Sequence, residues 1–306
     1  MSSRTFKRVA VIHGGFSAER AVSLVSGRDA ASALESAGYD VTTIDVSRDM
    51  QALTSAITAA NPEVIFNALH GRFGEDGCIQ GLLDMMGLPY TNSGRLASAL
   101  AMDKAVAKKI FATAGLPIAE DIIMTRKEAE KRDPMPRPYV VKPISEGSAI
   151  GVHIIRDGDN KTPFDDMGLD ADSLVMVERY IPGREVTVTV MGDKALAVTE
   201  ITTDHAFYDY DAKYAAGGSA HILPADLSPS IYDQALDISL KAHNALGCRG
   251  VTRSDLRLDG DDLFLLEINT QPGLTPTSLV PEQAAHIGMS FPELVSWMVE
   301  NAQCDA

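Results

Sequence analysis

The first part of the chain alternates strand-like and helix-like patterns of apolar residues. Three apolar runs have the length of strands and lie at residues 8–15, 39–46 and 63–69. A helical pattern separates the first two runs over much of Ala18 to Ala37, with Ser17 as its expected N-cap and Gly38 as its stop. Strand, helix and strand in this rhythm predict a parallel sheet with helices on its faces.

The pattern changes after residue 94. Residues 95–115 predict one helix that ends at Gly115. Short strand-like runs follow at residues 120–125, 138–142, 151–157 and 172–180. Residues 185–201 and 251–269 are typical of antiparallel strands, and residues 292–302 predict a closing amphipathic helix. We therefore expect an α/β protein with segments at residues 1–94, 95–181 and 182–306.

The stretch FLLEINTQPG, residues 264–273, places polar side chains at the end of an apolar strand. Side chains alternate along a strand, so Leu265, Glu267 and Asn269 are expected on one face. The preceding DGDD is a turn signal, and a three-residue loop at 260–262 would pair Asp255 with Glu267 and Arg253 with Asn269. A two-residue loop would reverse the relative faces.

With this register, Asp255, Glu267 and Asn269 form a group of oxygen donors beside the cation Arg253. Such a group suits Mg²⁺, which takes its remaining ligands from water and phosphates. The alternative is a solvated surface hairpin of alternating charge.

Lysines and glycines supply candidate phosphate contacts. Lys142 ends an apolar strand, and the flexible loop at 147–151 follows it with backbone N–H groups that could cradle phosphates. This loop is neither a P-loop nor a dinucleotide fingerprint, and an ordinary glycine-rich turn is the alternative. Lys104 lies near a helix start, whereas Lys108 and Lys109 are expected to be solvated.

Composition narrows the class of protein. The chain has 306 residues, 45% of them apolar, which predicts two or three soluble domains. It has no apolar stretch of membrane-spanning length and no signal-peptide core, so we expect the cytoplasm and no membrane partner. Its three cysteines form no CxxC pair. A formal charge of −15 disfavours a nucleic-acid surface but leaves room for a nucleotide.

The order of these motifs resembles that of the D-alanine–D-alanine ligases of the ATP-grasp superfamily. The resemblance rests on HGGFSAERAVS, NALHGRFGEDG, AMDKAVAKK, VVKPISEGSAIGV, YDYDAKY, RSDLRL and LLEINTQPGLTPTSLVP, which span nearly the whole chain. It implies an ATP-grasp fold with an N-terminal parallel α/β domain, a small central α+β domain and a C-terminal α+β domain. It also implies that ATP phosphorylates a first D-alanine, that a second D-alanine attacks the acyl phosphate, and that the dipeptide serves peptidoglycan synthesis.

The resemblance also assigns roles to residues. Glu19, Ser148 and Tyr214 would form a network at the first substrate, with His70 nearby, and Arg253 and the N–H of Gly273 would stabilise the oxyanion. Lys213 would reach the γ-phosphate, while Ser278 and Leu279 would hold the second carboxylate. ATP would contact Lys104, Lys142, Glu178, Ile181 and Glu185. Asp255, Glu267 and Asn269 would hold two Mg²⁺ ions, with Mn²⁺ as an alternative.

The residues leave other functions open. A D-alanine–D-lactate ligase would replace the second amine by a hydroxyl, and the intact YDYDAKY lid at 208–214 favours the dipeptide-forming type. A non-catalytic nucleotide-binding module or a metal-dependent hydrolase are the alternatives from other classes. The family resemblance further implies a homodimer.

Overall fold

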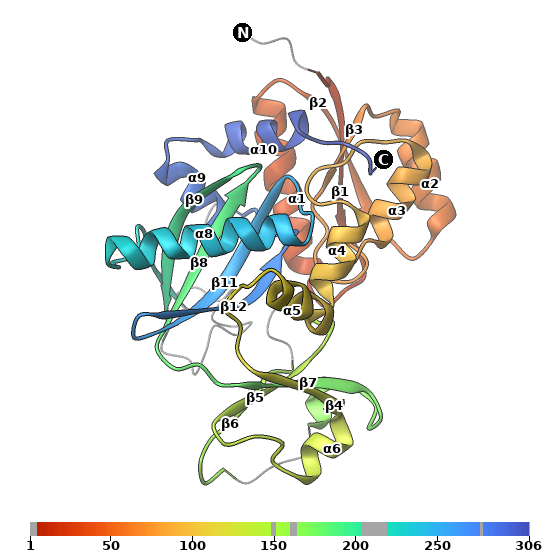
Figure 1. The fold of residues 1–306 in the computed structure, drawn as a ribbon. Coiled ribbons are helices and arrows are strands. Elements are labelled where there is room, and N and C mark those ends of the chain that lie inside the picture. Colours follow the sequence, from red (N-terminus) through yellow and green to blue (C-terminus); the bar gives the residue numbers. More distant parts are fainter. Residues whose placement is uncertain (1–4, 148–150, 160–163, 204–218, 276–277, 306) are drawn as a thin grey trace.

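The computed structural model describes residues 5–147, 151–159, 164–203, 219–275 and 278–305. Its named strands form three sheets, and each sheet falls within one of the three predicted segments (Figure 1). Among the described residues, no helix is long and apolar enough to span a membrane.

The first sheet is parallel, as the sequence predicts. β1 (Arg8–Gly14) lies between β2 (Asp40–Val46) and β3 (Val64–Asn67). Alternate residues of β1 enter two different cores: Val9 and Val11 pack on one face of the sheet, and Ala10 and Ile12 on the other. Burial on both faces explains the nearly continuous apolar run in β1.

Helices cover both faces of this sheet. α1 (Arg20–Ser36) packs with Val9 and Val11, while α2 (Met50–Ala60) and α3 (Cys78–Met86) pack with Ala10 and Ile12. The expected N-cap of α1 is wrong, because the helix begins after Glu19. The Ser17 hydroxyl instead donates to the carbonyl of His70 at 2.7 Å and so ties two loops together.

The single helix expected at residues 95–115 is two helices, α4 (Arg95–Met102) and α5 (Lys104–Thr113). Asp103 between them has an extended backbone, and its carboxylate accepts the N–H of Val106 at 3.0 Å. This side-chain cap starts a new helix where the apolar pattern alone predicts continuity.

The second sheet is antiparallel and lies at the bottom of Figure 1. α6 (Arg126–Lys131) and the short 3₁₀ helix η1 (Asp165–Met167) contribute to the apolar core on one of its faces. The strands match the four expected runs and have the order β4 (Asp121–Thr125), β7 (Leu174–Arg179), β5 (Tyr139–Pro143) and β6 (His153–Ile155).

The third sheet is also antiparallel. α8 (Pro229–Ala245), which the sequence patterns did not predict, packs on one face together with residues of α4 and α5. α9 (Leu279–His286) lies on the other face, where Gln283 donates to the Thr199 hydroxyl at 2.9 Å. The strand order is β10 (Ala220–Ile222), β9 (Lys194–Thr202), β8 (Arg184–Met191), β11 (Val251–Asp259) and β12 (Asp262–Asn269).

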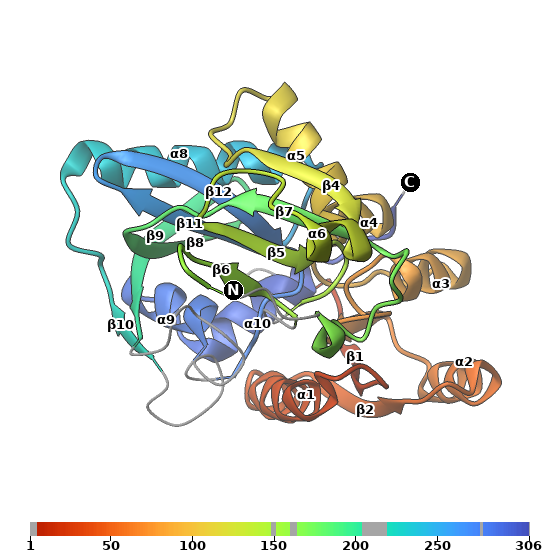
Figure 2. The same ribbon diagram turned by 90° about the horizontal axis from the view of Figure 1, so that it is seen from below.

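The last helix returns to the first segment. α10 (Phe291–Glu300) buries Leu294, Val295 and Met298 in the same core as Val9 of β1. Figure 2, which views the molecule from below, shows α10 close to α9. The first and third segments therefore share one apolar core, while the domain boundaries at 94 and 181 stay predictions.

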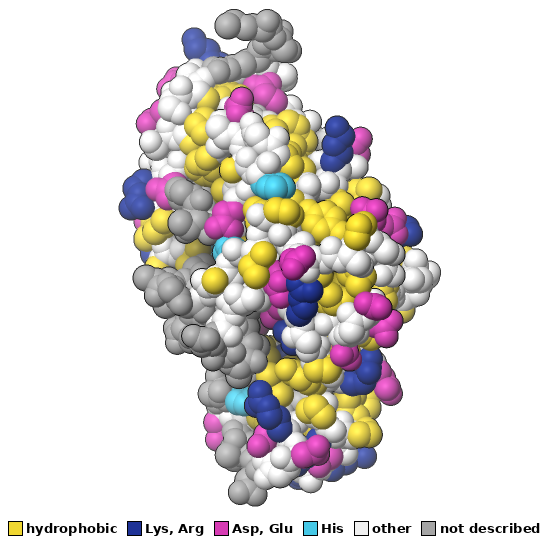
Figure 3. Space-filling model, turned by 90° about the vertical axis from the view of Figure 1, so that its left-hand side faces the viewer, with side chains coloured by type: hydrophobic (Ala, Val, Ile, Leu, Met, Phe, Trp, Pro, Cys, Tyr) yellow, Lys and Arg dark blue, Asp and Glu magenta, His cyan; other side chains and the backbone are white. Residues whose placement is uncertain are grey.

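The surface carries charges of both signs. On the face drawn in Figure 3, Lys and Arg side chains are scattered among Asp and Glu and form no continuous basic patch among the described residues. Exposed large apolar side chains include Met85, which is 89% exposed, and Leu96 on α4.

The buried His243 of α8 predicts how stability depends on pH. Burial lowers the pKa of His243 to about 4, and its Nδ1 lies 2.8 Å from the Thr252 hydroxyl. An unfolded histidine titrates near pH 6.5, so the unfolded chain takes up this proton first as the pH falls. Above about pH 6.5, His243 is neutral in both the folded and the unfolded chain, so its contribution to the free energy of unfolding does not change with pH. As the pH falls from 6.5 towards 4, we expect this residue to lower the free energy of unfolding by about 3 kcal/mol.

The measurement is the free energy of unfolding in urea, for the wild type and for His243→Gln, at neutral pH and near the folded-state pKa. As the pH falls, the free energy of unfolding of the wild type should decrease relative to that of His243→Gln. A difference independent of pH would contradict this role of His243.

Candidate active site

Two adjoining cavities of about 490 and 150 Å³ lie where the three sheets meet, and Lys104, Glu146 and Glu267 line both. Every predicted site residue that the structure describes lines at least one of them. Those on the larger cavity are Glu19, His70, Lys104, Arg253, Glu267, Asn269, Gly273, Ser278 and Leu279. Those on the smaller cavity are Lys104, Lys142, Glu178, Ile181, Glu185, Asp255 and Glu267. Ser148, Lys213 and Tyr214 lie outside the described residues.

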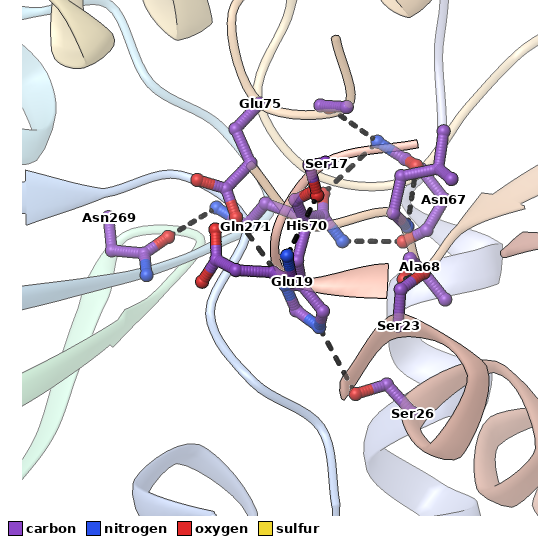
Figure 4. A network of polar contacts seen from close by, with 12 residues as sticks. Ser17, Glu19, Ser23, Ser26, Asn67, Ala68, His70, Glu75, Asn269 and Gln271 are labelled. Atoms are coloured by element: carbon purple, nitrogen blue, oxygen red, sulfur yellow. Dashed lines mark hydrogen bonds and ion pairs between the residues drawn. The ribbon is translucent and has the colours of Figure 1, made fainter. Parts of the chain in front are cut away.

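The larger cavity is acidic on the side of the first segment (Figure 4). Glu19, only 7% exposed, and Glu75 both line it. His70 is held from both ring nitrogens: Nε2 lies 3.1 Å from the Ser26 hydroxyl and Nδ1 lies 3.4 Å from Glu75 Oε1. Carboxylates beside a fixed imidazole suit a ligand that carries an ammonium group.

A buried amide joins the two sides of this cavity. The side chain of Gln271 donates to the carbonyl of Asn67 and accepts from the Asn92 side-chain amide at 2.8 Å. Its backbone N–H donates to Asn269 Oδ1 at 2.8 Å. As Figure 4 shows, Gln271 thereby connects the end of β12 to the end of β3. The sequence patterns did not single out this residue.

The hairpin of β11 and β12 has the expected pairs at the site but not the expected loop. Asp255 pairs with Glu267 and Arg253 pairs with Asn269, which confirms both predicted contacts. Asp259, however, pairs with Asp262 across a two-residue turn, so the predicted three-residue loop is wrong. A bulge after Asp255 compensates for this one-residue difference.

The same bulge breaks the expected alternation along β12. Leu265 and Ile268 enter the same apolar core, although they are three residues apart. Leu266 and Glu267 both line the smaller cavity instead of facing opposite ways. The expectation that Leu265, Glu267 and Asn269 share one face is therefore wrong at Leu265.

Arginine and lysine side chains pair with the carboxylates of this hairpin. Arg253 binds Asp255 through two bonds, from Nε at 2.8 Å and from the terminal nitrogen at 2.7 Å. The Thr187 hydroxyl donates to the same carboxylate at 2.9 Å. Glu267 lies 3.3 Å from the amine of Lys104.

The donors fit magnesium in chemistry but form an incomplete set. Asp255, Glu267 and Asn269 offer oxygens on paired strands, which is what a hard divalent ion requires. Among the described residues, no group of three acidic, histidine or cysteine side chains is placed to hold a metal. A bound Mg²⁺ would therefore need further oxygens from phosphates or water.

Two lysines from different elements line the smaller cavity. Lys104, at the start of α5, donates to the carbonyl of Glu146 at 2.7 Å. Lys142 of β5 donates to Glu178 Oε2 of β7 at 2.7 Å. Burial alone lowers the pKa of Lys142, but Glu178 outweighs burial and holds that pKa above its ordinary value. The amine is therefore charged beside the cavity.

Lys108 is not solvated, contrary to the expectation. Its side chain is 2% exposed, and its amine donates to Glu178 Oε1 at 2.6 Å. Burial alone raises the pKa of Glu178, yet Lys142 and Lys108 together hold it below its ordinary value. On α5, Lys108 lies on the buried face with Ala107 and Phe111. A lysine on the apolar stripe was the signal that could have identified it.

Arg257 organises the far end of the smaller cavity. Its guanidinium donates to the carbonyls of Ile181 at 3.2 Å and Gly183 at 2.9 Å. It also lies 3.2 Å from a carboxylate oxygen of Glu185. Arg257 thus fixes the connection between β7 and β8 together with Glu185, one of the predicted ATP contacts. Its position two residues after Asp255, on the same face of β11, was the available signal.

The opposite end of the larger cavity is built around the start of α9. Ser278 occupies the N-cap position, and its hydroxyl lies 2.7 Å from that of Thr275. A Cβ added to Gly273 would lie 3.2 Å from this Ser278 hydroxyl, so a side chain at 273 would crowd it. A helix N-terminus beside a serine hydroxyl suits a carboxylate.

Comparisons with known proteins agree along nearly the whole chain. A family model described as D-ala D-ala ligase C-terminus matches residues 110–300, and one described as D-ala D-ala ligase N-terminus matches residues 49–93. A D-alanine–D-alanine ligase of Rhodospirillum rubrum is 60% identical over 300 residues, covering 98% of this chain and 99% of that protein. One of Paramagnetospirillum magneticum is 57% identical over 305 residues, covering 98% and 99%.

Solved structures give the same result. The crystal structure of a D-alanine–D-alanine ligase from Bacillus anthracis has a TM-score of 0.84 and 31% identity, covering 96% of this chain and 97% of that one. The structure of that enzyme complexed with ATP has a TM-score of 0.81 and 29% identity, covering 97% of each chain. The expected ATP-grasp fold is thereby confirmed. The chain belongs to the D-alanine–D-alanine ligase family.

Proposed function

We propose that this protein joins two molecules of D-alanine in an ATP-dependent reaction that proceeds through D-alanyl phosphate. The observation that carries the proposal is the junction of the two cavities at Lys104 and Glu267. One cavity has the lysines suited to nucleotide phosphates, and the other has the carboxylates suited to an amino acid. Their junction is where a phosphoryl group would pass between the two ligands.

In the first step, a carboxylate oxygen of the first D-alanine attacks the γ-phosphorus of ATP, and ADP leaves. Glu19 would bind the ammonium group of this substrate, near His70. Lys104 and Lys142 would hold the phosphates, while Ile181 and Glu185 would border the adenosine. Enzymes accelerate phosphoryl transfer mainly through positioning and charge stabilisation, which these fixed groups can provide.

In the second step, the amine of the second D-alanine attacks the acyl carbon. The amine loses a proton, and inorganic phosphate leaves as the peptide bond forms. Arg253 and the N–H of Gly273 would stabilise the oxyanion, and removing one such donor typically costs about 10²–10³ in rate. Ser278 and the N–H of Leu279 would hold the second carboxylate at the start of α9.

Asp255, Glu267 and Asn269 would hold Mg²⁺, which would supply positive charge to the phosphate oxygens. Arg253 and Lys104 now pair with Asp255 and Glu267, so metal binding would require these carboxylates to share their partners. Ser148, Lys213 and Tyr214 stay predictions from the family resemblance. We further propose that the protein is a homodimer, that it lies in the cytoplasm and that its product serves peptidoglycan synthesis.

The proposed reaction is tested by phosphate release from ATP in the presence of Mg²⁺. We expect release with D-alanine but not with L-alanine, and a product with the mass of a dipeptide. Addition of D-lactate should produce no depsipeptide. Release without D-alanine would favour a hydrolase, and nucleotide binding without any release would favour a non-catalytic module.

Glu267→Gln should lower D-alanine-dependent phosphate release by more than about 100-fold, because it removes one of two carboxylate donors for the metal. Asp262→Asn is the matched control, since it removes one negative charge from an exposed position on the same strand. The assay compares rates over a range of Mg²⁺ concentrations. Equal rates in the two variants would exclude Glu267 as a ligand.

Gly273→Ala should raise the KM of the second D-alanine and lower kcat/KM about tenfold, since overpacking typically costs 1–3 kcal/mol. The added methyl group would press on the Ser278 hydroxyl. Gly81→Ala is the control, because its Cβ would be similarly close, at 3.1 Å, to the flexible Arg95 side chain away from the site. Steady-state kinetics with varied D-alanine provide the measurement. An unchanged KM and kcat/KM for Gly273→Ala would contradict the assignment of Ser278 to the carboxylate of the second D-alanine.

A further inference from the structure

The buried amine of Lys108 has the partners it needs within the protein. A lysine ammonium has three N–H donors. Lys108 Nζ lies 2.6 Å from the carbonyl of Ala119, 2.6 Å from Glu178 Oε1 and 3.0 Å from Asp121 Oδ1. These three acceptors match the three donors, so Lys108 retains none for a ligand.

Lys142 binds the other oxygen of the same carboxylate but is differently placed. Its amine donates to Glu178 Oε2 at 2.7 Å, which is its one hydrogen bond to the described part of the chain. Lys142 also lines the smaller cavity, whereas Lys108 does not. Donors of Lys142 therefore remain for a ligand in the cavity.

Glu178 thus stands between a structural lysine and a ligand-facing lysine. It is 3% exposed, and its two oxygens are divided between Lys108 of α5 and Lys142 of β5. An ionised carboxylate at such a depth needs compensation by paired charges. If Lys142 alone compensated Glu178, a phosphate that attracted Lys142 would leave the carboxylate uncompensated.

We propose that Lys108 is a positioning residue of the nucleotide site, which holds Glu178 so that Lys142 can bind a nucleotide phosphate. Lys108 keeps Glu178 compensated and oriented, and Glu178 in turn aims the amine of Lys142. The inference rests on the proposed function, because it deepens the phosphate-binding role of Lys142. It adds a residue that touches neither the nucleotide nor the amino acids.

The test is Lys108→Met, which keeps most of the length of the side chain and removes its charged amine. Hydrogen bonds to charged groups contribute enough that we expect the KM for ATP to rise about tenfold or more. The KM for D-alanine should stay within about twofold, because the larger cavity is not lined by Lys108. Lys109→Met is the matched control: it makes the same change at the next, exposed position of α5 and should behave as wild type.

A second variant separates positioning from general stability. Lys108→Met can unfold the protein by leaving Glu178 poorly compensated, whereas Lys108→Met with Glu178→Gln removes both charges. The double variant should regain part of the lost thermal stability, although Lys142 then faces an amide instead of a carboxylate, and it should keep the raised KM for ATP. The effects of Lys108→Met and Glu178→Gln on that KM should also be less than additive, because both act through Lys142.

Two results would overturn the inference. One is a folded Lys108→Met protein whose KM for ATP equals that of Lys109→Met. The other is a double variant that regains both stability and wild-type ATP kinetics, which would give Lys108 a structural role only.

Direct titration with ATP or ADP keeps this test separate from the proposed reaction. If the wild type binds nucleotide but shows no D-alanine-dependent turnover, the proposed function fails. The inference about Lys108 then still stands or falls on whether Lys108→Met weakens nucleotide binding relative to Lys109→Met. If both variants bind nucleotide as the wild type does, the inference fails even when the ligase reaction is present.

Discussion

The pairing register of β11 with β12 is the constraint on which the site depends. It sets Asp255 opposite Glu267 and Arg253 opposite Asn269, and a bulge in β12 maintains these pairs despite the short turn. A shift of one residue would turn the polar side chains of one strand into the apolar core. Leu265 and Ile268 prevent this shift, because both are anchored in that core.

A second principle of the site is that cationic side chains of the protein already pair with the carboxylates of Asp255, Glu267 and Glu178. Arg253 pairs with Asp255, Lys104 pairs with Glu267, and two lysines share Glu178. Breaking a buried pair by removing one partner is costly, whereas exchanging one partner for another is less so. Binding of a phosphate or a metal is therefore an exchange of partners, and the geometry of the existing pairs decides how readily it proceeds.

Much of the fold was predictable because its signals are local. The runs at 8–15, 39–46 and 63–69 became parallel strands, since burial on both faces requires continuous apolar sequence. The break at Asp103 was missed because a single capping side chain outweighed an unbroken helical pattern. α8 was not predicted, although its N-cap Ser228 is followed directly by Pro229, a sequence signal for a helix start.

The sequence predicted which residues belong to the site better than it predicted the contacts between them. Asp255, Glu267 and Asn269 were grouped with a three-residue loop that the structure does not have, and their pairing holds because a bulge offsets the shorter turn. The bulge that keeps these residues paired could not be predicted, because it depends on how Leu265 and Ile268 pack in three dimensions. Lys108 and Gln271 were missed for a related reason: their partners lie up to 204 positions away in the sequence.

The core shared by β1 and α10 bears on the order in which the chain can fold as it is synthesised. Domains generally fold as units, with N-terminal ones first. Here one face of the first sheet, including Val9 and Phe66, is covered by Leu294, Val295 and Met298 near the other end of the chain. Until α10 has left the ribosome, α1 alone among these helices covers that face, and the cover is incomplete. The first segment to emerge is thus among the last to complete its packing.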